Sequence, residues 1–147
     1  MKVAVGFDHG GFNLKRNICE LIKGDGHEVL DMGAYCLDPN DDYPDFAIKV
    51  ALEVSSSNAT KGIVVCGSGV GASIAANKIK GVRASVCHDL YSAQQGVEHD
   101  DMNVLCLGGR IIDQATAAEL VKGFLNADFS GEERHIRRLN KINKIDH

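Results

Sequence analysis

Short runs of apolar residues alternate with longer amphipathic segments along the whole chain. The longer segments repeat apolar residues at helical spacing, as Leu14, Ile18, Leu21 and Ile22 do. The pattern predicts five strands, at 2–7, 27–32, 61–66, 82–87 and 103–108. It predicts six helices, at 12–23, about 44–56, from the glycine-rich stretch 66–71 onward, 91–98, 113–125 and about 131–146.

Strands that are apolar along their whole length and are joined by helices are typical of a parallel sheet covered on both faces. Right-handed crossovers then give a three-layer α/β/α sandwich with a doubly wound, five-stranded parallel sheet, of the Rossmann or flavodoxin-like type. The chain has 147 residues, which is about the length of one domain. We find no linker, internal repeat or low-complexity segment, so we expect residues 1–147 to form a single domain that ends in a tail helix.

Composition and charge narrow the class of protein. Hydrophobic residues make up 44% of the chain and charged residues 24%, as in globular domains. The net charge of −4 argues against binding to nucleic acid or to an anionic membrane. No apolar run approaches the ~20 residues that cross a bilayer. The five cysteines are scattered without a CxxC pair, and the first residues do not resemble a signal peptide. We therefore expect reduced thiols in a cytoplasmic protein.

Two candidate binding loops follow the first and third predicted strands. Asp8-His9-Gly10-Gly11 follows the first, and CGSGVG, residues 66–71, follows the third. Ligands of open α/β sheets bind outside the carboxyl ends of the strands. If these two strands are neighbours, as in the flavodoxin-like order, both loops face one crevice. The alternate glycines of the second loop let backbone N–H groups converge on an anion at the start of a helix.

The sequence leaves two interpretations of Cys66 open. A helix N-terminus lowers the pKa of a thiol, which would make Cys66 a base or a nucleophile. Most free cysteines are instead small buried hydrophobic residues. The same loop also matches a dinucleotide fingerprint, Gly67-x-Gly69-x-x-Ala72, with Asp89 located 20 residues after Gly69. That fingerprint normally opens the first βαβ unit, whereas here it opens the third.

A second group of polar residues lies toward the end of the chain. His99 precedes the fifth strand, so it lies near the edge of the sheet opposite to Cys66. It is therefore either an ordinary histidine or part of a site on another subunit. Arg134 and Arg138 are four residues apart and share a face of the tail helix. They form either a solvated basic face or, with His9, a clamp for a phosphate group.

Six stretches of the sequence resemble the ribose-5-phosphate isomerase B family, which includes the galactose-6-phosphate isomerase subunits. They are GFDHGGFNLK (6–15), DYPDFA (42–47), CGSGVGASIAANK (66–78), VRASVC (82–87), YSAQ (91–94) and NVLCLGGR (103–110). The resemblance covers residues 2 to about 141. It implies an aldose–ketose isomerase of the pentose phosphate pathway, which interconverts D-ribose 5-phosphate and D-ribulose 5-phosphate through an enediolate. It also implies no cofactor, no metal, and a homodimer or dimer of dimers whose active sites are shared between subunits.

The resemblance also implies a role for each matching residue. Cys66 would be the base that moves a proton between C1 and C2, and His99 the acid that opens the sugar ring. The substrate-binding residues that it implies are Asp8, His9, Tyr43, Gly67, Ser68, Gly69, Val70, Gly71, Asp100, Arg110, Arg134 and Arg138. Among these, Asp8 and His9 would bind the sugar and its phosphate end, and Gly67 to Gly71 the enediolate oxygen.

One position departs from the usual pattern of the family. An asparagine commonly follows the catalytic histidine, and this chain has Asp100 there. A carboxylate beside an anionic substrate weakens binding unless an arginine offsets it or the contact uses the backbone, so the preferred phosphosugar stays open. Galactose 6-phosphate and allose 6-phosphate are the alternatives to the pentose. A non-catalytic module that binds a dinucleotide or a phosphosugar is the remaining alternative.

Overall fold

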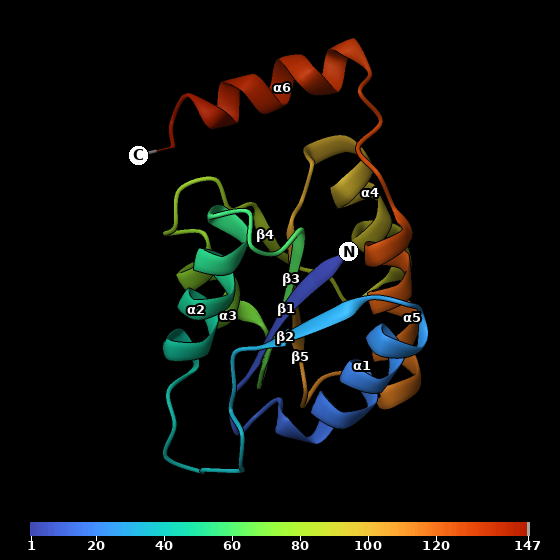
Figure 1. The fold of residues 1–147 in the computed structure, drawn as a ribbon. Helices are drawn as coiled ribbons and strands as arrows, with labels where there is room; N and C mark the ends of the chain where they lie inside the picture. The colour runs from blue at the N-terminus through green and yellow to red at the C-terminus, as the bar shows by residue number, and fades with distance from the viewer. Residues whose placement is uncertain (147) are drawn as a thin grey trace.

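In the computed structural model, which describes residues 1–146, five parallel strands form one sheet between two layers of helices (Figure 1). The strands are β1 (Lys2–Phe7), β2 (Glu28–Asp31), β3 (Lys61–Cys66), β4 (Ala84–Val86) and β5 (Val104–Gly108). The helices are α1 (Phe12–Gly24), α2 (Tyr43–Ser55), α3 (Val70–Ala76), α4 (Leu90–Asp100), α5 (Gln114–Asn126) and α6 (Glu133–Asn143). The last position of the predicted domain, 147, lies outside the described residues.

The strand order is β2-β1-β3-β5-β4, with every neighbouring pair parallel. The order confirms the doubly wound sandwich and the expected contact between β1 and β3. It differs from the flavodoxin-like order, because β5 lies between β3 and β4. All residues of β5 are buried, whereas β4 is shorter than the predicted 82–87 and its Ser85 is exposed. The more apolar strand takes the inner position, and the half-polar strand ends the sheet.

Each face of the sheet has its own hydrophobic core. On one face, Val3, Val5 and Phe7 of β1 pack with α1, α4 and α5. On the other face, Val64 and Cys66 of β3 pack with α2 and α3. Figure 1 shows these helical layers on either side of the sheet. Because side chains alternate along a strand, Cys66 lies on the α2–α3 side, at the carboxyl end of β3.

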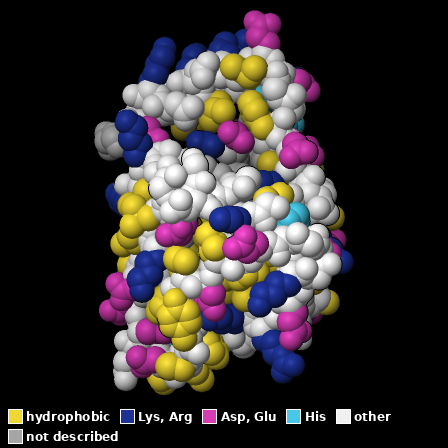
Figure 2. Space-filling view, viewed as in Figure 1, with side chains coloured by type: hydrophobic (Ala, Val, Ile, Leu, Met, Phe, Trp, Pro, Cys, Tyr) yellow, Lys and Arg dark blue, Asp and Glu magenta, His cyan; other side chains and the backbone are white. Residues whose placement is uncertain are grey.

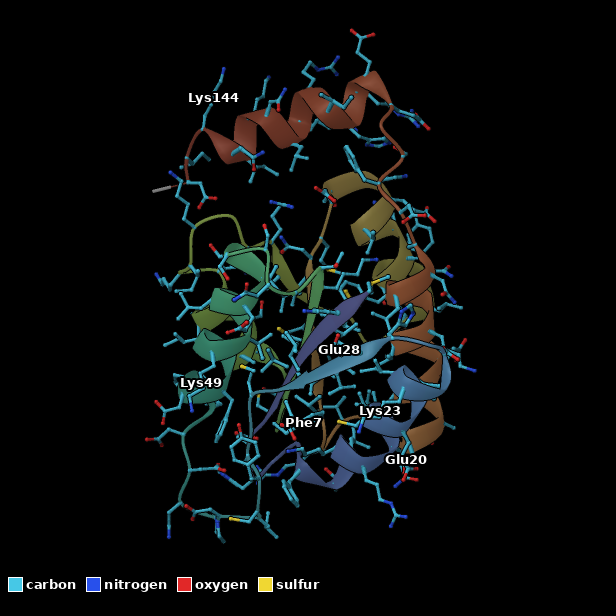
Figure 3. All side chains as sticks on the ribbon, in the orientation of Figure 1. Phe7, Glu20, Lys23, Glu28, Lys49 and Lys144 are labelled. Carbon is cyan, nitrogen blue, oxygen red and sulfur yellow. The ribbon has the colours of Figure 1, made fainter. Side chains whose placement is uncertain are left out.

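The tail helix α6 stands apart from both layers and lies across the amino end of the sheet, opposite to the loop between β2 and α2 (Figure 1). It contacts α4, and the Asp146 carboxylate accepts a hydrogen bond from the Gly81 N–H at 2.6 Å. Figure 2 shows hydrophobic side chains on the side of α6 that faces the rest of the molecule, next to a hollow. That hollow has a volume of about 380 Å³, and Ile142 and Ile145 line it. In Figure 3, Lys144 lies just after α6 at the top of the view, whereas Phe7, at the carboxyl end of β1, lies inside the lower half of the molecule.

Within residues 1–146, no helix combines the length and the apolar character that a membrane span requires. The cysteines differ in their surroundings, although all five are free thiols. Cys66, Cys87 and Cys106 are buried, Cys19 is partly buried, and Cys36 is exposed on the loop between β2 and α2. Burial raises the pKa of the Cys19, Cys87 and Cys106 thiols.

Candidate active site

The two predicted binding loops meet at the carboxyl edge of the sheet. The register of β1 and β3 places Phe7 opposite Val65, so that Asp8 and Cys66 follow on neighbouring strands. The Asp8 N–H continues the ladder by donating to the Val65 carbonyl at 3.3 Å. The two strands that the sequence could not place side by side, β1 and β3, are therefore neighbours. Both loops open on the same side of the molecule.

The glycine-rich loop turns sharply around the Cys66 thiol. Gly69 has a φ of +80°, a left-handed conformation that glycine adopts without steric cost. This turn brings the Gly69 N–H to 3.1 Å from the Cys66 Sγ, to which it donates a hydrogen bond. The turn thus directs a backbone hydrogen-bond donor at the Cys66 sulfur atom. At Gly71 a Cβ would lie 2.5 Å from the Tyr43 ring, so glycine there lets Tyr43 close against the loop.

The loop after β5 fixes the glycine-rich loop from its other side. The Gly109 N–H donates to the Cys66 carbonyl at 2.7 Å, and the Arg110 N–H donates to the Gly67 carbonyl at 3.1 Å. The Arg110 side chain lies over Gly67, where an added Cβ would come within 3.2 Å of its guanidinium. A permanent positive charge is thus held beside the backbone N–H groups of the loop.

Asp8 and His9 form the opposite wall. Asp8 is buried, and its Oδ1 accepts hydrogen bonds from the Gly10 and Gly11 N–H groups at 2.8 and 3.1 Å. Burial raises the pKa of Asp8 above its ordinary value, although these N–H groups favour the carboxylate. The His9 imidazole bonds through Nδ1 to the Asp41 carboxylate at 2.8 Å, and this bond is the main reason that the pKa of His9 is raised.

Together these groups line an open hollow of about 420 Å³. The lining residues are Asp8, His9, Tyr43, Cys66, Gly67, Ser68, Gly71, Arg110 and Ile111. Eight of the predicted site residues therefore lie in one place. Gly69 and Val70 do not line it, because Gly69 turns toward the backbone of β5 and the Val70 side chain is exposed to solvent. A thiol, a carboxylate and two basic groups facing one hollow suit a small, anionic, hydroxylated ligand.

The remaining predicted residues lie at the other edge of the sheet. His99 is near the end of α4, where its Nδ1 is 3.0 Å from the Gln95 Nε2. Its ring stacks on the His135 ring with centroids 4.0 Å apart. Asp100 is exposed beside the hollow under α6. His99 therefore lies at the amino edge, as the sequence predicts.

The phosphate clamp that would combine His9 with Arg134 and Arg138 is not formed within one chain. Both arginines are exposed on α6, and Arg134 pairs with Glu132 at 3.1 Å. His9 lies at the carboxyl edge, and β5 alone, with its five residues, separates the edges by about 16 Å. The clamp interpretation is wrong for a single chain, because α6 packs over the amino end of the sheet.

The dinucleotide interpretation is also not supported. Asp89 caps α4, since its carboxylate accepts hydrogen bonds from the Ser92 N–H at 2.7 Å and the Ser92 hydroxyl at 2.9 Å. It follows β4, and β5 lies between β4 and β3. The acid of the fingerprint must reach a ribose bound at the glycine loop, and here an intervening strand separates the two.

Asp8, His9 and Asp41 bring three potential metal-ligating atoms within 4.8 Å of one another. Hydrogen bonds already account for this arrangement. The Asp8 Oδ1 accepts from two backbone N–H groups, and the Asp41 Oδ1 bonds to both nitrogens of His9 that face it. We therefore treat the three side chains as a hydrogen-bonded group.

Sequence reasoning missed Asp41, Gln95 and His135. Asp41 lies in a polar loop 32 residues after His9, and no local pattern links the two. His135 lies 36 positions after His99, on the helix that carries the predicted arginines. The position of Gln95, one helical turn before His99, was the only local signal available.

Comparison with known proteins gives a consistent picture. A family model described as ribose/galactose isomerase matches residues 3–142. Ribose-5-phosphate isomerase B of Escherichia coli is 43% identical over 99% of this chain and 96% of its own. The structure of Clostridium thermocellum ribose-5-phosphate isomerase B superposes with a TM-score of 0.94 at 47% identity, covering 99% of this chain and 97% of that one. The Mycoplasma genitalium enzyme with bound ribulose-5-phosphate superposes with a TM-score of 0.93 at 41% identity, covering 98% and 95%.

Proposed function

The chain belongs to the ribose/galactose isomerase family, and from this premise we propose that it interconverts D-ribose 5-phosphate and D-ribulose 5-phosphate as an aldose–ketose isomerase. The observation that carries the proposal is the full-length similarity to ribose-5-phosphate isomerases B, one of which has ribulose-5-phosphate bound. The hollow at the carboxyl edge supports it, since its residues match the needs of an enediolate reaction. We likewise propose that residues 1–147 act as one isomerase domain.

In the proposed reaction, Cys66 carries the proton between the two carbons. As a thiolate it removes the proton from C2 of the open-chain aldose, and the electron pair of that bond moves toward O1 to give an enediolate. The thiol then returns the proton to C1, while the O2 hydroxyl loses its proton to O1 and becomes the ketone. One base on one face of the enediolate therefore both removes the proton from C2 and returns it to C1, as general acid–base catalysis requires.

The glycine-rich loop stabilises the charge that develops on the enediolate oxygens. Its N–H groups are held in place by the hydrogen bonds from Gly109 and Arg110, so they need no reorganisation during the reaction. Such preorganised donors contribute about 3–4 kcal/mol each to transition-state stabilisation. Asp8 binds sugar hydroxyls in this proposal, and His9 and Arg110 bind the phosphate end.

The proposal includes a second subunit. His99 opens the sugar ring, and Asp100, Arg134 and Arg138 complete the substrate site, although all four lie at the edge opposite to Cys66. A homodimer or a dimer of dimers places the amino edge of one chain at the carboxyl edge of another and forms two equivalent sites. The apolar side of α6 supports such an assembly, and the five free thiols support a cytoplasmic location.

The test is direct. The purified protein is mixed with ribose 5-phosphate, and ketose formation is followed together with parallel reactions on galactose 6-phosphate and allose 6-phosphate. We expect turnover of the pentose. Turnover of a hexose phosphate alone would move the assignment to the galactose branch of the family. Tight binding of a dinucleotide without any isomerisation would refute the enzyme assignment.

A further inference from the structure

Asp41 holds His9 through two hydrogen bonds to the same oxygen. The Asp41 Oδ1 accepts from the His9 backbone N–H at 2.9 Å and bonds to the His9 Nδ1 at 2.8 Å. The Asp41 side chain is 10% exposed, and the turn that carries it is closed by the Asp41 N–H donating to the Asp38 carbonyl. The second carboxylate oxygen, Oδ2, is buried and has no hydrogen-bond partner within residues 1–146. The hydrogen bonds of the Asp41 carboxylate are therefore directed at His9.

This contact determines which nitrogen of His9 carries a proton. A carboxylate oxygen only accepts hydrogen bonds, so Nδ1 must be the protonated nitrogen. In the neutral ring Nε2 then has a lone pair and repels an anionic oxygen. Nε2 becomes a donor only when the ring takes up a second proton and becomes a cation. Binding of a phosphate oxygen by His9 is thus tied to protonation of the ring.

Charged groups face His9 from three elements. Asp41 comes from the loop before α2, Asp8 from the end of β1, and Arg110 from the loop after β5. The Asp41 hydrogen bond raises the pKa of His9 most, the charge of Asp8 also raises it, and Arg110 opposes both. Asp41 therefore offsets the repulsion that would otherwise keep a second positive charge away from Arg110.

We infer that Asp41 is a positioning residue for the substrate phosphate: it favours the doubly protonated state of His9, so that Nε2 donates to a phosphate oxygen beside Arg110. The inference rests on the proposed function, since it concerns the phosphate end of the same hollow. It predicts that the upper pH limit of phosphate binding is set by the Asp41–His9 pair.

Asp41→Asn tests the inference, because an amide oxygen still accepts from the His9 backbone N–H and from Nδ1–H but carries no charge. The His9 ring is titrated by NMR in the whole protein, with its signal assigned by its loss in His9→Gln. We expect the wild-type midpoint above 6.5, the value of an unperturbed histidine, and a lower midpoint in Asp41→Asn. Asp38→Asn is the matched control, since it removes an exposed carboxylate from the same loop, and it should leave the His9 midpoint unchanged.

The second measurement is binding of inorganic phosphate, together with KM for ribose 5-phosphate, between pH 5.5 and 8.5. At each pH, the dissociation constant and KM of the variant are divided by those of the wild type. This ratio cancels the titration of the ligand itself. We expect a ratio near 1 at pH 5.5 that rises to about tenfold near pH 8, as charge-assisted hydrogen bonds are the strong ones, with kcat nearly constant. A flat ratio overturns the inference. A wild-type His9 midpoint at or below ~6.5 also overturns it, and this measurement does not depend on whether Asp41→Asn folds. Absence of isomerase activity in the wild type would refute the proposed function, while the NMR and phosphate titrations would still decide the role of Asp41.

Discussion

The carboxyl and amino edges of the sheet differ in how their polar side chains are held. At the carboxyl edge, Cys66, Asp8 and His9 each have a hydrogen-bond partner within the chain and face one hollow. At the amino edge, Arg134 and Arg138 are exposed on a helix that contacts the body through α4. The groups of the first edge are held around one hollow, whereas the arginines of the second edge extend from an exposed helix, where Arg134 pairs with Glu132 at 3.1 Å. This difference supports the proposal that the amino edge of one chain completes the site at the carboxyl edge of another.

Lys61 shows that the amino edge has a structural role as well. This buried lysine begins β3, and its ammonium donates to the Phe124 and Ala127 carbonyls at 2.7 and 2.8 Å. It thereby satisfies carbonyl groups at the C-terminal end of α5. Buried Lys61 at the amino edge thus holds the fold, while buried Asp8 and Cys66 at the carboxyl edge line the open hollow.

The largest effect is expected at the carboxyl edge. Cys66→Ala removes the proposed base, so kcat should fall by at least ~100-fold, the usual contribution of such a group, while KM changes little. Steady-state kinetics with ribose 5-phosphate measure it. Cys106→Ala is the control, because it deletes a buried thiol of the same face of the sheet without touching the hollow. A Cys66→Ala enzyme that keeps more than about a tenth of wild-type kcat contradicts the role of the thiol.

The sharing of sites between chains is tested by mixing variants under conditions of subunit exchange. Equal amounts of Cys66→Ala and His99→Asn should recover about a quarter of wild-type sites, because half of the dimers then contain one intact site of two. The inverse experiment mixes wild type with the Cys66→Ala/His99→Asn double variant. Shared sites predict that activity falls from a half to about a quarter of the all-wild-type value, whereas sites within one chain leave it at a half. That second result, with exchange demonstrated, would show that the edges do not cooperate between subunits.

A smaller effect is expected for Lys61→Met, which removes the donor of two carbonyl groups at similar side-chain length. Each buried carbonyl left without a partner costs about 1–3 kcal/mol, so the free energy of unfolding should drop by a similar amount. Denaturant titration measures the loss, and Lys2→Met, at the exposed start of β1, is the control. Retention of wild-type kcat would support a structural role, and a large loss of kcat in a folded variant would argue for a catalytic one.

The smallest effect is expected in the pH dependence of stability. His9 at the carboxyl edge and His135 at the amino edge should change the free energy of unfolding with pH in opposite directions. Asp41 raises the pKa of His9, so its contribution to stability is full below pH ~6.5 and is lost as pH rises through the folded-state pKa. Burial, with the charges of His99 and Arg134, lowers the pKa of His135, so stability falls as pH drops below ~6.5.

Thermal unfolding at pH 5.5 and 8.5 resolves the two histidines. His9→Gln should lower Tm by more degrees at pH 5.5 than at pH 8.5. His135→Phe, which keeps a stacking ring against His99, should instead reduce the loss of Tm on acidification. If both variants changed Tm with pH in the same direction, the two histidines would not contribute to stability with opposite pH dependence.

The sequence predicted more of the fold than of the site. Apolar runs such as KGIVVC define a strand locally, because a buried strand needs no other information than its own side chains. The limits of β4 and the order of β5 and β4 depend instead on competition for the interior of the sheet, which a local pattern does not record. Asp41 and His135 were missed for the same reason, since each acts on a residue more than 30 positions away.

By itself, the sequence determined the alternation of strands and helices, the turn at the glycine loop, and the presence of Cys66 at the end of a strand. These depend on short-range chemistry: apolar periodicity, and the left-handed backbone at Gly69 that glycine accepts readily. Only the tertiary structure decided that Asp8, His9 and Arg110 face Cys66, that Asp41 binds His9, and that His99 lies at the opposite edge. Those placements follow from the packing of strands and helices across the whole sheet, because a side chain meets distant partners only where the folded backbone carries it.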